Sequence, residues 1–267
     1  MTQDPRLERC LDALHGLLQR KYAIPLPSRR TSGGDYEVQR AALAMVELVS
    51  QFAQAIIDLG RVGHHRYVAA CACARSAFEI GATATWLVLP EDPSVRVNRW
   101  VDYFRAMDRF WNNLGNELSS VMPELSETAL RQAEQYAEHR RVVEVGLPAV
   151  RPQPRPNLQQ ILNELRHPDL YVAYRIMCQM VHGEPESLLI TMGNRGSSLM
   201  FGSFAEATSW VIPIRMTVWS LTISAPTVLQ RVGVASGLCE PIYEQERVCH
   251  GYLDILEGKQ TMPLHAI

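Results

Sequence analysis

The feature that most constrains this chain is a run from about Arg66 to Leu89 that is apolar on nearly every helical face and ends at Pro90. A helix that is apolar all round must be covered on every side, by other helices or by lipid. Two charged residues, Arg75 and Glu79, stand near its middle, where a bilayer would make them costly. The run therefore predicts the buried central helix of a bundle.

Other segments show the three- and four-residue apolar spacing of helices, with capping residues at their ends. Gly60 follows one such segment as a C-terminal stop, and Asp92 before Pro93 has the form of an N-cap. Ser126 can cap a segment that is polar on most faces, and Asn157 with Gln160 fits a capping box at the start of a shorter helix. Proline at 213 and 226 predicts kinks in a late apolar helix. The expected helices span about 7–21, 36–59, 66–89, 93–114, 126–145, 157–166, 170–182, 204–232 and 241–257.

These segments predict an all-α fold, a multi-helix bundle formed by a single domain over residues 1–267. A proline-rich connector at about 146–156 divides an N-terminal helical half from a C-terminal helical half. A Gly-Asn-Arg-Gly turn between two short extended runs predicts a small β-hairpin near 188–201.

The net charge and the cysteine content restrict the functions and the cellular location that the chain can have. Lysine and arginine total 26 against 28 aspartate and glutamate residues, a formal charge of −2, so binding of nucleic acid would need a local basic patch. The six cysteines have no CxxC spacing, which favours reduced, structural thiols. The N-terminal segment lacks the apolar stretch of a signal peptide. We expect a cytoplasmic protein with no membrane partner.

Arg75 and Glu79 are four residues apart, on one face of the central apolar helix. Partial burial of both charges would require partners. Two interpretations remain open: an ion pair that fixes the helix register, or a polar site lined from the centre of the bundle.

A second polar group lies on the segment 170–182. Arg175 and His182 are seven residues apart and share one helical face with Tyr171 and Cys178, while Tyr174 flanks it. Arginine can bind a phosphate through two hydrogen bonds, and histidine transfers protons near neutral pH. RNA cleavage through a 2′-hydroxyl requires such a pair. Alternatively, His182 interacts only with the terminal carbonyls of its helix.

This arrangement of an arginine, six intervening residues and a histidine near a helix end resembles the signature of the HEPN superfamily. The long apolar helix with Arg75 and Glu79 inside it, followed by a tyrosine-rich helix that ends at His182, also resembles related uncharacterised bacterial all-helical domains. The resemblance implies an all-helical, metal-independent endoribonuclease of a bacterial toxin or antiphage defence system, with RNA as substrate and a homodimeric assembly. It implies His182 as acid and base and Arg175 as the group that stabilises the phosphorane, supported by Arg75 and Glu79. Ile176 follows the arginine where the family usually has a polar residue, so a catalytically inactive relative is an alternative.

Two further functions fit the same residues. The chain could be a helical small-molecule-binding module with a polar pocket at Arg75, Glu79 and His182. It could also be a non-catalytic interaction subunit that binds an antitoxin or another protein partner through the polar helix and the connector. No HExxH, P-loop, GxGxxG or GxSxG motif is present, so the sequence indicates no metal site and no cofactor.

Overall fold

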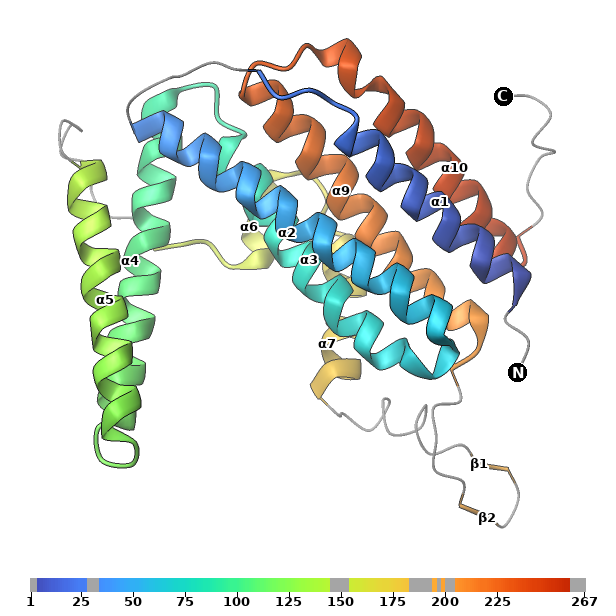
Figure 1. The fold of residues 1–267 in the computed structure, drawn as a ribbon, viewed down its shortest axis with the longest axis horizontal. Helices are drawn as coiled ribbons and strands as arrows, with labels where there is room; N and C mark the ends of the chain where they lie inside the picture. The colour runs from blue at the N-terminus through green and yellow to red at the C-terminus, as the bar shows by residue number, and fades with distance from the viewer. Residues whose placement is uncertain are drawn as a thin grey trace.

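The computed structural model describes residues 4–27, 34–144, 154–182, 194–195, 198–199 and 205–259. Within these ranges the chain forms nine α-helices and three short 3₁₀ turns, which confirms the all-α bundle (Figure 1). The helices are α1 Pro5–Tyr22, α2 Gly34–Val62, α3 Tyr67–Val88, α4 Pro93–Leu118, α5 Pro123–Glu144, α6 Leu158–Glu164, α7 Leu170–His182, α9 Val211–Arg231 and α10 Glu240–Leu256.

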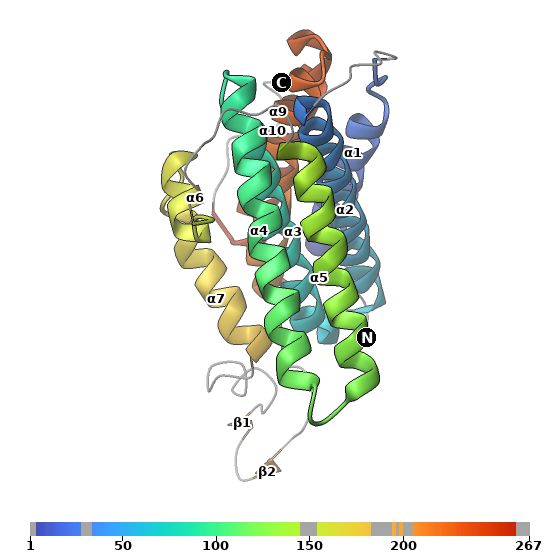
Figure 2. The same ribbon diagram turned by 90° about the vertical axis from the view of Figure 1, so that its left-hand side faces the viewer.

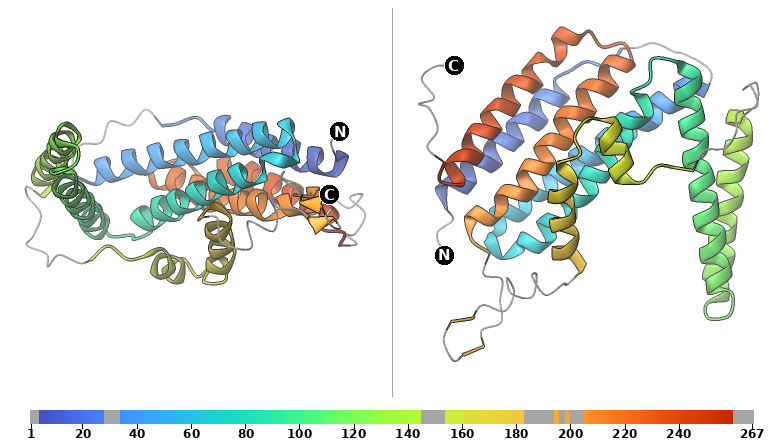
Figure 3. Two further views of the ribbon diagram at one scale, coloured as in Figure 1. Left: turned by 90° about the horizontal axis from the view of Figure 1, so that it is seen from below. Right: turned by 180° about the vertical axis from the view of Figure 1, so that it is seen from behind.

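The apolar run identified in the sequence forms α3, which packs against α2, α4, α6, α7 and α9. Seen from below, α2 lies on one side of α3, and α6 and α7 lie on the other (Figure 3, left). Helix α1 packs against α10 and α2, so both ends of the described chain belong to one hydrophobic core. The α4–α5 pair projects from this core, with α5 packed mainly against α4 (Figures 1 and 2).

Small residues allow α3 and α9 to approach closely. A Cβ atom at Gly81 would lie 3.1 Å from the backbone oxygen of Ser220. The buried hydroxyl groups of this contact donate hydrogen bonds within their own helices, as Thr85 does to the Gly81 carbonyl and Ser220 to the Met216 carbonyl. These two hydroxyl groups are therefore satisfied within their own helices.

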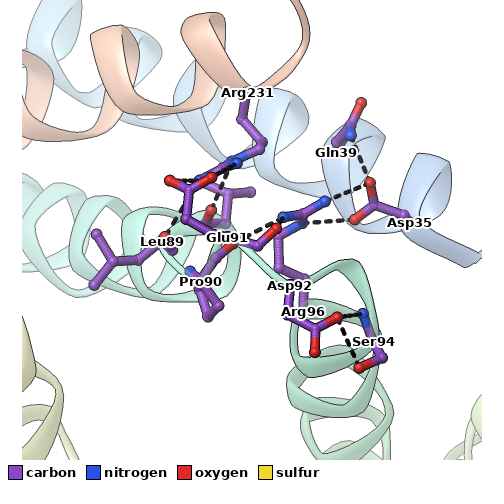
Figure 4. Close-up of polar contacts among 10 residues, drawn as sticks. Asp35, Gln39, Leu89, Pro90, Glu91, Asp92, Ser94, Arg96 and Arg231 are labelled. Atoms are coloured by element: carbon purple, nitrogen blue, oxygen red, sulfur yellow. Dashed lines mark hydrogen bonds and ion pairs between the residues drawn. The ribbon is translucent and has the colours of Figure 1, made fainter.

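Arginines from two other helices bind the backbone carbonyls at the C-terminal end of α3 and in the turn that follows (Figure 4). Arg96 of α4 donates to the carbonyls of Pro90 and Glu91, each at 2.8 Å, and holds Asp35 of α2 through two bonds of 2.7 Å. Arg231 of α9 donates to the carbonyls of Val88 and Leu89. A helix end leaves such acceptors unpaired, and these guanidinium groups supply the donors. We call this the arginine corner.

Several sequence-based boundaries are confirmed. Asp92 accepts a hydrogen bond from the Ser94 backbone N–H, with Pro93 at the first helical position. Asn157 and Gln160 form a capping box at the start of α6. Both signals depend only on residues within one turn, so they do not need tertiary structure.

The prediction that Gly60 ends its helix is wrong, because α2 continues to Val62. The glycine instead provides space. A Cβ atom at this position would lie 2.7 Å from one methyl carbon of Leu11 and 3.2 Å from the ring of Trp210. The absence of a side chain is required for packing rather than for backbone conformation.

Gly60→Ala is accordingly expected to lower the free energy of unfolding by about 1–3 kcal/mol, because the added methyl group overpacks the core. Gly251→Ala in α10 is the matched control, since nothing lies within 4 Å of a Cβ there. Removing a glycine from a helix interior should stabilise that variant by about 0.5–1 kcal/mol. Urea denaturation measures both, and equal effects at the two positions would contradict the packing argument.

A predicted kink and a predicted N-cap also differ from the structure. Pro213 lies in the first turn of α9, where no backbone N–H is needed, so only Pro226 lies inside the helix. Ser126 lies inside α5, which begins at Pro123, and its hydroxyl donates to the carbonyl of Gly115 in α4. A hydrogen bond to a neighbouring helix replaces the expected N-cap.

Most of the predicted hairpin near 188–201 lies outside the described residues. Within them, β1 (Asn194–Arg195) and β2 (Ser198–Leu199) pair antiparallel over two residues each. This short pairing does not establish the predicted hairpin, and the fold class is all-α. Most of the connector at 146–156 also lies outside the described residues, so the division of the chain at this point stays a prediction.

Among the described helices, α2 alone has the length and hydropathy of a membrane span, with 39% of its most apolar window buried. A core helix of a soluble protein has the same properties. Here α2 packs against α1, α3, α4 and α9.

Candidate functional site

An open pocket of about 340 Å³ lies where α7 crosses α3. The structure brings all seven predicted site residues to this place: six line the pocket, and Glu79 contacts two of them. Gln179 is an additional lining residue. The lining residues are Arg75 from α3 and Tyr171, Tyr174, Arg175, Cys178, Gln179 and His182 from α7.

The spacing of the α7 residues explains why they face one way. Tyr171, Arg175, Cys178 and His182 follow at intervals of four, three and four, so their side chains form a stripe along one side of the helix. The opposite side carries buried methionines, Met177 and Met180. Burial of the methionine side against the bundle leaves the polar stripe near the surface, where it lines the open pocket together with Arg75.

Glu79 joins the two helices. Its Oε1 atom accepts one hydrogen bond from Arg75 Nε at 3.0 Å and another from the Tyr174 hydroxyl at 2.6 Å. Burial of the phenol and the bond to Glu79 raise the pKa of Tyr174, so this residue stays protonated and donates near neutral pH. The side chains of Arg75 and Glu79 are 26% and 41% exposed, so the pair lies at the edge of the pocket rather than in the apolar core.

Arg75 also contacts the histidine. Its Nη1 atom lies 3.0 Å from Nε2 of His182. A guanidinium group can only donate, so Nε2 must be the accepting nitrogen and the imidazole carries its proton on Nδ1. In this arrangement His182 is neutral, and the lone pair that a general base would use is already bonded. The alternative in which His182 contacts only the carbonyls of its own helix therefore does not describe this geometry.

Arg175 is exposed at the pocket and has no hydrogen-bond or ion-pair partner in the part of the chain that the structure describes. Arg75, by contrast, shares its charge with Glu79. The two guanidinium groups and one carboxylate give the site a net positive charge while His182 is neutral. This small basic patch contrasts with the chain's overall charge of −2.

Aromatic rings form one wall of the pocket. Tyr171 and Tyr174 stack with centroids 5.8 Å apart and planes 26° apart, and Tyr174 also stacks on Phe78. The guanidinium of Arg75 lies 5.7 Å from the centre of the Tyr174 ring. Stacked tyrosines beside arginines form a surface on which a planar base can stack.

Sequence reasoning missed the direct bond between Tyr174 and Glu79 and the contact between Arg75 and His182. Spacing along α7 predicts the stripe, but only the packing of α7 on α3 places it against Arg75, 107 residues away. Among the described residues, no group of three or more His, Cys, Asp and Glu side chains forms a candidate metal site. Comparison of the chain with protein-family models, with curated proteins and with solved structures finds no match.

Thiol reactivity gives a direct measure of access to this pocket. At pH 8, a disulfide reagent is expected to modify Cys178 in the pocket and the partly buried Cys73 first, because the other four thiols are buried. Burial raises the pKa of Cys10 and Cys249 to about 12 and that of Cys71 to about 11, so these remain as unreactive thiols. Cys178→Ser should remove one fast-reacting thiol, and six equal rates would contradict the described burial.

Proposed function

We propose that the α3–α7 pocket binds an RNA phosphodiester and cleaves it without a metal ion, as a HEPN-like endoribonuclease. One observation carries the proposal: Arg75, Arg175 and His182 line a single open pocket beside two stacked tyrosines. Arginines bind phosphate through paired hydrogen bonds, histidine transfers protons near neutral pH, and tyrosines stack on bases. A role in bacterial defence, a cytoplasmic location, a homodimer and a protein antitoxin belong to the same proposal.

The reaction uses one proton carrier. His182 Nε2 takes the proton of the 2′-hydroxyl, the 2′-oxygen forms a bond to phosphorus, and the bond from phosphorus to the 5′-oxygen breaks. The imidazolium then returns its proton to the departing 5′-oxygen. The products are a 2′,3′-cyclic phosphate and a 5′-hydroxyl end. Arg175 stabilises the additional negative charge on the phosphorane.

Arg75 links substrate binding to this step. Because it donates to Nε2 in the free protein, it must leave the histidine before Nε2 can accept a proton. A phosphate oxygen is a charged acceptor and forms a stronger bond to guanidinium than a neutral imidazole does. Binding of the phosphodiester would draw Arg75 Nη1 away from His182, while Glu79 keeps Arg75 Nε in place.

The test is cleavage of single-stranded RNA in the presence of EDTA, with the products identified by their ends. We expect EDTA-resistant cleavage that yields 2′,3′-cyclic phosphate and 5′-hydroxyl termini. A DNA strand of the same base sequence is the matched control and should stay intact, since it has no 2′-hydroxyl. Cleavage of the DNA, a requirement for added metal, or intact RNA after incubation with folded protein would each contradict the proposal.

The bond between Arg75 and His182 also favours a second candidate, a module that binds an anionic ligand without reaction. In that case Arg75 and Arg175 hold the anion and His182 remains neutral. A thermal-shift titration with inorganic phosphate and nucleoside monophosphates tests it, since ligand at 100 times its Kd stabilises a protein by about 2.7 kcal/mol. Arg175→Gln should abolish the shift, whereas Arg20→Gln on the exposed side of α1 should not. Shifts that are equal in both variants would contradict this site.

A further inference from the structure

A second pocket, of about 300 Å³, lies between α2, the C-terminal end of α9 and the segment that follows α1. We call it the α2–α9 pocket, and it shares no residue with the α3–α7 pocket. A cavity of this size is at the lower end of the range for small-molecule sites and has room for about ten heavy atoms. The lining residues are Leu26, Pro27, Tyr36, Gln39, Arg40, Leu43, Arg231, Val232 and Gly233.

The spacing of residues on α2 gives this pocket one continuous wall. The four lining residues of α2 follow one another at intervals of three, one and three, so they lie on one side of the helix. At the end of α9, Gly233 has a φ of +100°, a conformation that favours glycine and lets the chain turn. A Cβ atom at this glycine would lie 4.0 Å from Cγ of Pro27, so two segments far apart in the sequence close the other side.

Part of the lining is aliphatic. Leu43 and Val232 are partly buried and pack against the hydrophobic core, and Leu26 is 60% exposed. A ligand with an alkyl chain would cover these side chains and remove apolar surface from water, which is favourable. An apolar chain is therefore the part of a ligand that this wall recognises.

Hydrogen-bond donors line the same pocket. Arg40 is 64% exposed and has one partner among the described residues, Glu37, whose Oε2 atom lies 2.9 Å from its Nη2 atom. The Tyr36 hydroxyl has no hydrogen-bond partner in the part of the chain that the structure describes. Most of the N–H groups of Arg40 and the hydroxyl of Tyr36 are therefore available to an acceptor on a ligand.

Arg231 shows which acceptor these donors suit. Its Nη1 and Nη2 atoms hold the carboxylate of Glu91 at 3.1 and 3.2 Å (Figure 4). The Glu91 side chain is 92% exposed, and exposed ion pairs are weak, so a ligand carboxylate can replace it. Glu37 and Glu91 already balance the charges of the two arginines, which leaves no surplus positive charge for a dianion such as a phosphate ester.

We propose that the α2–α9 pocket binds a small aliphatic monocarboxylate, a fatty acid of about eight carbons. Its carboxylate accepts hydrogen bonds from Arg40, Tyr36 and Arg231, and its alkyl chain covers the aliphatic wall. Eight carbons and two oxygens make the ten or so heavy atoms for which the pocket has room. The inference does not depend on RNA cleavage, because the two pockets share no residue.

Isothermal titration calorimetry of the full chain with sodium octanoate tests the proposal. We expect saturable binding of one octanoate per chain with a Kd of about 1 mM or lower, an affinity that about ten heavy atoms can supply. Octanamide has the same size but no charge and should bind at least about tenfold more weakly. Butyrate is shorter by several methylene groups and should also bind at least about tenfold more weakly, because it buries less apolar surface.

Two substitutions locate the binding. Arg40→Gln should weaken octanoate binding at least about tenfold and Tyr36→Phe about tenfold, because each removes a donor to the carboxylate. Arg61→Gln is the matched control, since Arg61 is also an exposed arginine of α2 with carboxylate partners but does not line the pocket. This variant should bind octanoate as the wild-type protein does.

Circular dichroism confirms that every variant is folded before titration. The absence of saturable octanoate binding to the wild-type protein would overturn the proposal. Equal affinities for octanoate and octanamide would exclude recognition of the carboxylate and overturn it as well. Equal losses in Arg40→Gln and Arg61→Gln would place the ligand outside the α2–α9 pocket, with the same consequence.

Discussion

Replacing Arg96 with methionine is expected to lower the free energy of unfolding by about 3 kcal/mol, the lower end of the cost of breaking a buried ion pair, because the Asp35 side chain left behind is 27% exposed. The Arg96 side chain is only 4% exposed. Its loss would leave the carboxylate of Asp35 without a cationic partner, with only the Gln39 amide still donating to it, and would remove the Arg96 donors from the carbonyls of Pro90 and Glu91. Methionine fills much of the volume but supplies no hydrogen bond.

Urea denaturation followed by circular dichroism measures this effect. Arg40→Ala is the matched control, because Arg40 pairs with Glu37 on the exposed side of α2, with 64% of its own side chain exposed. An exposed pair of this kind contributes at most about 1 kcal/mol. Arg96→Lys should recover only part of the loss, since an ammonium group cannot reproduce the forked geometry of guanidinium. Comparable losses for Arg96→Met and Arg40→Ala would contradict the importance of the arginine corner.

His182→Ala is expected to reduce RNA cleavage by about 10²–10⁴-fold, the usual contribution of a positioned acid or base. Since His182 lies at the exposed end of α7, the substitution should leave the fold intact. His65→Ala is the matched control, an exposed histidine that does not line the pocket. Initial rates in EDTA, with RNA binding measured separately, distinguish lost chemistry from lost affinity.

Arg175 and Arg75 should differ in their effects. Arg175→Gln should weaken RNA binding and slow the reaction together, because this exposed cation has no other partner among the described residues. Arg75→Gln removes a cation but also releases Nε2 of His182, so its effect on the rate should be smaller. Cleavage retained by His182→Ala would exclude the histidine from the chemistry. The pocket would then be better explained as a site that binds an anionic ligand without reaction.

Much of the fold could be predicted because helices depend on local signals. The apolar run of α3, the Asp92–Pro93 start of α4 and the capping box of α6 all depend on residues within a few positions of one another. Gly60 was misread because a glycine at a helix end and a glycine at a close helix contact look alike in sequence. Only the neighbouring Leu11 and Trp210 distinguish them.

For the candidate site, too, local sequence patterns predict the residues on one helix but not the packing between helices. A spacing of seven residues placed Arg175 and His182 on one face, and a spacing of four placed Arg75 beside Glu79. That the two pairs share one pocket depends on how α7 packs on α3, which no local pattern specifies. The arginine corner was not predicted for the same reason, because Arg96 and Asp35 are 61 residues apart and their pairing exists only in the folded chain.

The arginine corner has a consequence for a part of the molecule that it does not touch. By binding the carbonyls at one end of α3, it fixes the rotation of the helix about its axis and the position of the helix along that axis. Arg75 lies thirteen residues before Val88, about 20 Å along the helix. A slip of α3 by one residue would rotate Arg75 by about 100° and move it away from His182. The orientation of the pocket is therefore set at the opposite end of the helix, and variants of Arg96 or Arg231 should misalign the pocket without contacting it.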